Sequence, residues 1–444
     1  MRQSNDGMLG AMPVPRLVVT MSLPIMLSML ISAVSNLVDS VYVAQYSDEA
    51  FLALSYAYPI QMLLVAFCSG IGVGFSAIFS RRLGEGDQEQ AASAVCHGFF
   101  LYGLCWLLFL LFALTGAAPF LRLSTEDPSV ARQGAQYLLI CCGLSIGTCM
   151  QFLTERILQA MGRPAGFMIV QGSGAILNLI LDPIFIFVLD LGVAGAAAAT
   201  VIGQISGALI GFWLVYRLRH QLPIRLRGFR PRGEMLAEMG RVAAPAVVMQ
   251  SLSSFMSLGL NQLLTRWSQS AVFVLGAYFK LQTFIFMPIF GISSGLIPIL
   301  SYNYGSGALR RVSASVRFGQ QFTAVLSLSG ALLLSLLASP LLRSAFRASP
   351  EALAMGAPAL RIIALSFFFA GTSIIFCSAF QSLGRSRWSL LVALLRQILL
   401  LLPAAALLLA LKPALVWAAF PLSELISCFA AALLYRRTIQ KQLL

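Results

Sequence analysis

Residues 70–86, GIGVGFSAIFSRRLGEG, return later in the chain as residues 291–307, GISSGLIPILSYNYGSG, with glycines at matching places. The same offset pairs Pro24 with Pro245. Matching glycines carry backbone information, because each marks a close approach of two helices or a turn that needs a positive φ. The chain therefore consists of two copies of one structural unit.

The surroundings of these copies follow from the small number of charges. Only 10% of the 444 residues are charged and 59% are hydrophobic, whereas a soluble protein of ordinary composition has about a quarter charged residues. So few charges cannot cover a surface exposed to water, and the solvent around the chain must be lipid. The sequence predicts a multi-pass membrane protein.

Twelve apolar segments predict an all-α integral membrane protein, because each is long enough to cross about 30 Å of hydrocarbon at about 1.5 Å per residue. They are residues 17–43, 52–80, 93–116, 134–158, 167–189, 194–216, 240–266, 271–301, 318–339, 353–381, 388–410 and 413–435.

Each copy contributes six of these segments. Because six is even, both copies begin and end on the same side of the membrane, so a pseudo-two-fold axis along the membrane normal relates them. We expect two six-helix bundles, residues 1–216 and 240–444, joined by a basic cytoplasmic linker, residues 217–239. Rocking of one bundle against the other would give alternating access to a cavity between them.

The net charge of +14 is unevenly distributed among the loops. Basic residues gather at 81–82, 217–232, 310–311 and 385–387, whereas the intervening connections are acidic or neutral. Positively charged loops remain in the cytoplasm, so both termini are predicted to be cytoplasmic. The bilayer, with its anionic headgroups, is the expected partner of these bases. A nucleic-acid-binding protein would instead gather them on one soluble face, so we exclude nucleic acid.

The residue types needed for metal or catalytic chemistry are scarce. All eight cysteines lie in apolar segments without a CxxC pair, and the only histidines are His97 and His220. We interpret the cysteines as small buried hydrophobes and expect no disulfide, metal or cofactor. An intramembrane enzyme would need a nucleophile and a base, and the sequence has neither HExxH nor GxSxG, so we expect a protein that is not an enzyme.

Two acids within the apolar segments are candidates for binding a coupling ion. A charge there costs about 2.5–3.5 kcal/mol on insertion scales and so needs an explanation. Asp39 and Asp182 lie at comparable depth, and Asn178 is on the same helix face as Asp182. Such a group favours proton uptake, or holds a monovalent cation between its oxygens. Alternatively, Asp39 caps a bent helix end and Asp182 merely precedes Pro183 at a kink.

Five other charges within the segments have simpler interpretations. Glu155 is near the cytoplasmic end of its segment, where we expect it to reach water. Glu424 lies near the middle of the membrane together with Lys280, Arg361 and Arg396. We expect a structural ion pair between Glu424 and one of these bases. Lys280 is alternatively a charge that moves during the transport cycle.

Pro24 and Pro245 interrupt the first helix of each copy, and each removes one backbone hydrogen bond. A kink is the minimal interpretation, and a hinge close to Asp39 is the stronger one.

The second helix of each copy carries polar and aromatic residues that are candidates for lining a substrate cavity. Gln61 and Gln282 occupy matching positions in the repeat, and aromatic rings could hold flat apolar ligands. For each ring, a place in the core or against lipid is the simpler interpretation. The candidate cavity residues are Tyr58, Gln61, Lys280, Gln282 and Phe284.

Several motifs together resemble the multidrug and toxic compound extrusion (MATE) transporters. They are NLVDSVYVAQ, GIGVGFSAIFSRRLGEGD, LGVAGAAAAT and YFKLQTFIFMPIFGISSGLIPILSYNYGSG. The resemblance implies a V-shaped pair of bundles that exports amphipathic, often cationic, compounds against an inward proton or sodium gradient.

The similarity also implies site residues. In the DNA-damage-inducible (DinF-like) branch, a first-segment aspartate and an Asn and Asp four apart in the fifth segment couple the ion. They match Asp39, Asn178 and Asp182. Another branch uses acids in segments 7 and 10, which this chain lacks, and Arg361 lies in its segment 10. Glu155 stands where the family motif commonly has asparagine.

We therefore expect a multidrug antiporter of the cell membrane that acts as a monomer and uses H⁺ or Na⁺. The nearest alternative is a flippase for lipid-linked precursors, which would need a basic cavity for pyrophosphate, whereas the intramembrane bases here are confined to the second copy. A channel would instead show steady passive flux.

Overall fold

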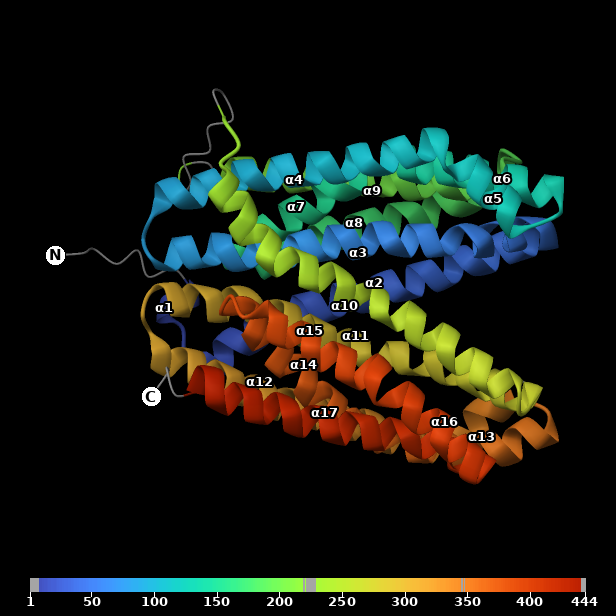
Figure 1. The fold of residues 1–444 in the computed structure, drawn as a ribbon. Helices are drawn as coiled ribbons and strands as arrows, with labels where there is room; N and C mark the ends of the chain where they lie inside the picture. Colours follow the sequence, from blue (N-terminus) through green and yellow to red (C-terminus); the bar gives the residue numbers. More distant parts are fainter. Residues whose placement is uncertain (1–7, 219, 221–228, 345, 347, 441–444) are drawn as a thin grey trace. The chain divides into compact units, whose positions relative to one another are not determined.

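The computed structural model describes residues 8–218, 220, 229–344, 346 and 348–440. Within these residues every regular element is a helix (Figure 1). The first half of the chain contains α1 (Met8–Ala11), α2 (Val14–Tyr46), α3 (Asp48–Gly84), α4 (Gln88–Thr115), α5 (Ala117–Ser124), α6 (Pro128–Gly143), α7 (Ile146–Ala160), α8 (Pro164–Pro183), the π-helix η1 (Ile184–Val188) and α9 (Gly192–Arg217).

The second half repeats this pattern. It contains α10 (Gly233–Thr265), α11 (Gln269–Gly305), α12 (Leu309–Ser344), α13 (Pro350–Ala364), α14 (Phe367–Ser382), α15 (Ser386–Leu394), the π-helix η2 (Leu395–Leu399), α16 (Leu401–Leu411), the 3₁₀-helix η3 (Pro413–Ala418), α17 (Ala419–Tyr435) and the π-helix η4 (Arg436–Gln440).

The twelve predicted membrane spans are confirmed when two bent helix pairs are each counted as one span. In the described part of the chain ten helical spans are long and apolar enough to cross a membrane, and the pairs α6–α7 and α13–α14 bend by 42° and 43°. The bends fall at equivalent places in the repeat. At each bend a serine hydroxyl, that of Ser145 or Ser366, donates to the carbonyl oxygen three residues earlier. The backbone N–H of the same serine also donates to that oxygen, over 3.3 Å and 2.9 Å respectively, so each serine closes a tight turn at the bend.

The repeated glycines have matching backbone conformations. Gly86 and Gly307 have φ values of 77° and 75°, and Gly162 and Gly384 have values of 73° and 72°. A side chain is disfavoured in this left-handed region, so glycine is needed at these turns. The internal repeat in the sequence is therefore also a repeat in the backbone.

The chain forms two compact units. One combines Met1–Met26 with Val248–Leu444, and the other is Leu27–Val247. Both boundaries lie within helices, in α2 and α10, a few residues after Pro24 and Pro245. The compact units and the two sequence copies therefore do not share boundaries. Of the predicted linker, residues 219 and 221–228 lie outside the described residues, and α10 begins within its last part.

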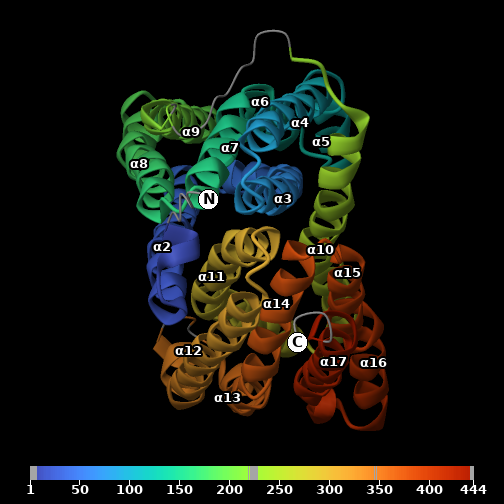
Figure 2. The ribbon, with the colours of Figure 1, turned by 90° about the vertical axis from the view of Figure 1, so that its left-hand side faces the viewer.

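In the unit Leu27–Val247 the helix α7 occupies the centre, where it packs against α3, α4, α8 and α9. These helices run side by side in Figure 1, and Figure 2 views them nearly end-on. Small residues bring α8 and α9 together: a β-carbon on Gly203 would lie 2.6 Å from the carbonyl oxygen of Gly174. This close approach brings the side chains of α8 within hydrogen-bonding distance of α9.

The other unit packs α11, α12 and α14 around two apolar clusters, one with the fully buried Phe367 and the other with the fully buried Phe380. Its helix α17 packs against α14 and α16. Both units thus have their own core, as expected of two copies of one fold.

Candidate functional site

The carboxyl end of α8 carries the predicted Asn–Asp pair. The amide Nδ2 of Asn178 donates to Oδ1 of Asp182 over 3.0 Å, and Asp182 is fully buried. Pro183 ends the α-helix because it has no N–H for the next hydrogen bond, and the chain continues as the π-helix η1. The local sequence therefore places a buried carboxyl at a change of helix type.

Neighbouring helices hold Asn178 in place. Its Nδ2 also donates to the hydroxyl of Thr200 on α9, over 3.3 Å, and its Oδ1 accepts from the hydroxyl of Ser35 on α2, over 3.2 Å. The Ser35 hydroxyl also lies 3.3 Å from the carbonyl oxygen of Ala175. Asn178 thus links three helices, and its orientation toward Asp182 is fixed.

Asp39 lies one helical turn beyond Ser35 and close enough to Asp182 for the two carboxyl groups to interact electrostatically. Among the residues that the structure describes, neither Oδ1 of Asp39 nor Oδ2 of Asp182 has a hydrogen-bond partner, although both atoms are buried. Two such carboxylates repel each other when both are ionised. A proton or a small cation bound between them would relieve the repulsion. The structure thus brings together the three predicted coupling residues.

Tyr137 on α6 extends this group of side chains. It is buried, and it interacts with the side chains of Gln61 and Cys141 and electrostatically with Asp39. Tyr137 therefore connects Gln61, predicted to line a substrate cavity, with Asp39.

Sequence reasoning missed Ser35, Thr200 and Tyr137. Ser35 precedes Asp39 by four residues, which puts both on one helix face, and Thr200 ends the alanine-rich LGVAGAAAAT. The sequence positions of Ser35 and Thr200 could therefore have indicated that they belong to the site. No sequence pattern indicates this for Tyr137.

The five predicted cavity residues are divided between the two compact units. Tyr58 and Gln61 lie on α3, and Lys280, Gln282 and Phe284 lie on α11. The side chains of Tyr58 and Phe284 are 52% and 44% exposed, so neither belongs to a core. Their joint role in one cavity stays a prediction.

The prediction for Glu155 was wrong. Instead of reaching water it is 2% exposed, and it accepts a hydrogen bond of 2.9 Å from Gln151. The reason is the central place of α7 among four other helices. The adjacent Arg156 is also buried: it donates to Gln159 and lies over the ring of Phe167.

The remaining intramembrane charges differ in their partners. Arg396 in η2 contacts Glu424 in α17 through two nitrogens, at 3.0 and 2.8 Å, so the expected ion pair of Glu424 is present. Arg361 does not share it, because its Nε donates to the carbonyl oxygen of Ser335 over 3.3 Å. The side chains of Arg361 and Lys280 are both exposed.

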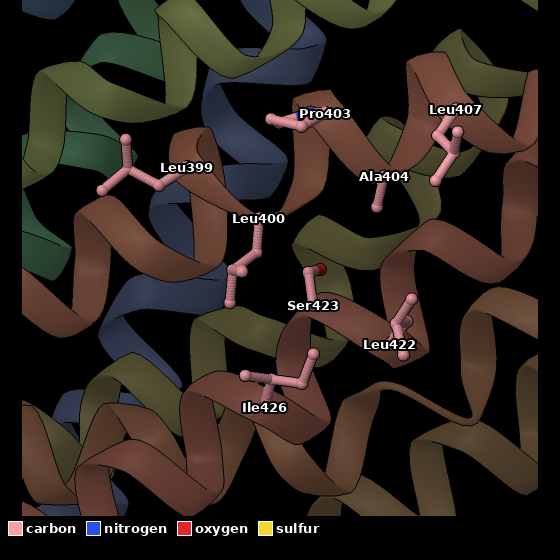
Figure 3. Close-up of a pocket in the computed structure, with 8 residues that line it drawn as sticks. All are labelled: Leu399, Leu400, Pro403, Ala404, Leu407, Leu422, Ser423 and Ile426. Carbon is pink, nitrogen blue, oxygen red and sulfur yellow. The ribbon is translucent and has the colours of Figure 1, made fainter.

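A surface pocket of about 230 Å³ lies between the segment η2–α16 and α17 (Figure 3). Its lining consists of Leu399, Leu400, Pro403, Ala404, Leu407, Leu422, Ser423 and Ile426. The only polar side chain, that of Ser423, already donates to the carbonyl oxygen of Phe420. The pocket is therefore apolar and separate from the acid pair.

Three cysteines that are far apart in sequence meet in the unit Leu27–Val247. The sulfur atoms of Cys68, Cys105 and Cys149 all lie within 4.8 Å of one another. Each of the three lies on a different helix, so no local spacing in the sequence indicates this group.

Comparison with known proteins identifies the family. A model of the MatE family matches residues 24–184 and 245–407. The chain belongs to the MatE family. The two matched regions begin at Pro24 and Pro245, so the family model matches each copy of the repeat separately. This membership confirms the predicted family, and the twelve-span helical architecture agrees with it.

Curated relatives align with this MatE protein over most of their length. It is 26% identical to the multidrug export protein MepA of Staphylococcus aureus strain MRSA252, over 88% of this chain and 86% of the relative. It is also 26% identical to a FAD transporter of Shewanella oneidensis strain MR-1, over 91% and 90% of the two chains.

Solved structures show the same fold. One described as an outward-facing multidrug resistance MATE family transporter of the MOP superfamily superimposes with a TM-score of 0.92, at 23% identity, over 98% of this chain and 97% of that one. A MATE crystal structure in complex with MaD3S gives a TM-score of 0.91 at 22% identity, over 98% of both chains. The MatE protein is therefore a multi-pass membrane protein with the MATE fold.

Proposed function

We propose that this MatE protein is a secondary active antiporter that exports amphipathic, often cationic compounds in exchange for H⁺ or Na⁺. Its family and its relatives with names such as multidrug export protein support this proposal. The observation that carries it is the pair Asp39 and Asp182, whose carboxyl groups interact electrostatically and have one unpartnered oxygen each. Buried acids of this kind within membrane-spanning helices mark ion pathways.

The coupling step uses the exchange of one positive charge at the acid pair. When a proton binds, Asp39 becomes a hydrogen-bond donor and no longer repels Asp182. A sodium ion would instead be held by the free oxygens, since hard cations bind carboxylate and hydroxyl oxygens. In either case the interaction between α2 and α8 changes. Ser35 is the existing link between these helices and lies one turn from Asp39.

Pro24 and Pro245 serve as hinges in this proposal. Each lies inside a long helix, and each helix passes from one compact unit to the other within a few residues of its proline. A proline leaves a backbone carbonyl without its helical partner, so bending there breaks one hydrogen bond fewer. Ion binding at Asp39 would be transmitted along α2 to Pro24.

The proposal places both termini in the cytoplasm and the protein, as a monomer, in the cell membrane, in agreement with the positively charged loops. The DinF-like branch is the one whose coupling residues match Asp39, Asn178 and Asp182. A lipid-linked-precursor flippase is less well supported, because Arg396, one of the few intramembrane bases, is neutralised by Glu424.

Reconstitution in liposomes tests the function. A fluorescent lipophilic cation is followed under an imposed pH gradient and, separately, under a sodium gradient. Transport driven by the pH gradient alone indicates proton antiport, and transport driven by sodium alone indicates a sodium site. If thermal unfolding shows that the protein is folded and the fluorescent cation is still not transported under either gradient, multidrug antiport is contradicted.

A further inference from the structure

The three-cysteine cluster lies in the interior of the unit Leu27–Val247. Cys68 on α3, Cys105 on α4 and Cys149 on α7 are 0%, 4% and 0% exposed. Their sulfur atoms lie within 4.8 Å of one another, and those of Cys68 and Cys149 are 3.8 Å apart. Three thiols from three neighbouring helices thus point at one volume.

This spacing suits one central atom bonded to all three sulfurs. A centre with bonds of about 2.3 Å, the length of a zinc–thiolate bond, holds its sulfur ligands roughly 3.5 to 4.0 Å apart. The separation of Cys68 and Cys149 already falls in this range. The sulfur of Cys105 lies within 4.8 Å of both, so at most a small side-chain movement brings it into this range.

The surroundings of the cluster determine which net charge a bound centre can have. Among the described residues no histidine or acid joins the three thiols. All three cysteines belong to the apolar core of this unit. The hydroxyl of Tyr102 is already used, because it donates to the backbone oxygen of Cys68 over 2.8 Å. A net charge in such surroundings is costly.

A divalent ion with three thiolates has a net charge of −1, whereas a trivalent metalloid with three thiolates is neutral. Trivalent arsenic also arrives as the neutral hydroxide As(OH)₃, so no ion has to enter the apolar interior. Three thiols and one As(OH)₃ give As(SR)₃ and three waters: three As–O and three S–H bonds break, and three As–S and three O–H bonds form. No atom changes oxidation state, and no other reactant is needed.

We propose that Cys68, Cys105 and Cys149 form a binding site for a trivalent thiophilic metalloid, with arsenic(III) as the representative. The proposal is independent of the drug-transport function. An occupied site would join α3, α4 and α7 through one atom. Because the ligand binds the folded state, it raises the temperature of unfolding.

The test uses the purified full chain in detergent, free of thiol reductants, with arsenite as the ligand. We expect one arsenic per chain after desalting, three sulfur neighbours by X-ray absorption at the arsenic edge, and a higher unfolding temperature. Cys68→Ala, Cys105→Ala and Cys149→Ala should each weaken arsenite binding by more than the roughly 10–100-fold that loss of a residue supporting a ligand causes. The double variant C141A/C142A, which removes the two cysteines adjacent in sequence, is the matched control and should bind as the original protein does.

A second ligand distinguishes loss of the site from loss of folding. Phenylarsine oxide needs only two thiols, so Cys105→Ala should still bind it through Cys68 and Cys149 while it loses arsenite. Three results would overturn the proposal: arsenite binding unaffected by the three single variants, loss of binding in C141A/C142A, or binding of cadmium without binding of arsenite.

Discussion

Val247 packs so closely on Gly70 that a β-carbon added to the glycine would lie 2.7 Å from the backbone nitrogen of Val247. The equivalent relationship exists in the other compact unit, where a β-carbon on Gly291 would lie 2.9 Å from the backbone nitrogen of Met26. In both cases the first helix of one sequence copy packs on the second helix of the other copy. The GxxxG spacing therefore allows the close packing of these helices. Each compact unit in this way includes the beginning of the first helix of the other sequence copy.

Gly70→Ala and Gly291→Ala should destabilise the protein, because the added carbon meets backbone atoms that cannot move away. We expect a loss of about 1–3 kcal/mol for each, typical of overpacking. Gly276→Ala, on the same helix as Gly291 but with no atom near its β-carbon position, is the control. It should leave stability unchanged or raise it slightly, since alanine favours a helix. Thermal unfolding in detergent measures all three. Equal melting temperatures for G291A and G276A would show that the close approach is unimportant.

Asp39→Asn and Asp182→Asn should each abolish transport driven by an ion gradient while the protein stays folded. Neither unpartnered oxygen stabilises the fold, so removing one charge should leave stability unchanged or raise it by roughly 1 kcal/mol. Liposome transport and thermal unfolding are measured on the same preparations. Glu126→Gln, which removes an exposed acid between α5 and α6, should transport normally. Gradient-driven transport by D39N at the original rate would contradict the assignment.

Asn178→Leu should damage both stability and coupling, because it removes the bonds to Asp182, Thr200 and Ser35 together. Leaving the buried Asp182 without its donor costs about 1–3 kcal/mol. Thr200→Val removes only one acceptor and leaves the bond to Asp182, so its effect should be smaller. Melting temperatures and the sodium or pH dependence of transport separate the two variants. A larger effect of T200V than of N178L would contradict this order.

The twelve spans and the positive-φ glycines were predictable because periodic apolar segments and turns are local properties of the chain. Asp39, Asn178 and Asp182 were predictable as intramembrane polar groups. The interaction of Tyr137 with Asp39 was not, because it depends on how α6 lies in the folded unit. The burial of Glu155 and the meeting of the three cysteines likewise arise from helix packing, which leaves no pattern along the sequence.

Removing one partner of the ion pair Arg396–Glu424 should destabilise the protein, whereas replacing both partners by apolar residues should not. Its side chains are only 15% and 12% exposed, so Glu424→Gln leaves a largely buried arginine without its counter-charge. Breaking a buried pair in this way costs about 3–5 kcal/mol, whereas replacing both partners by apolar residues is often neutral. We expect a large drop in melting temperature for E424Q and recovery in the double variant R396M/E424M. Failure of the double variant to recover would indicate a role for the charges beyond stability.

Pro24→Ala should slow transport while it stabilises the protein. The new N–H can bond to the carbonyl oxygen of Thr20, four residues earlier, and thereby stiffen α2 where the helix passes between the two compact units. The transport rate under a fixed ion gradient and the melting temperature are the measurements. Pro340→Ala is the matched control, because Pro340 also lies inside a long helix, α12, but far along the chain from either unit boundary. A hinge at Pro24 requires that P24A reduce the rate and P340A leave it unchanged. Equal rates for the two variants would mean that Pro24 only shapes the helix and that the movement of α2 originates elsewhere.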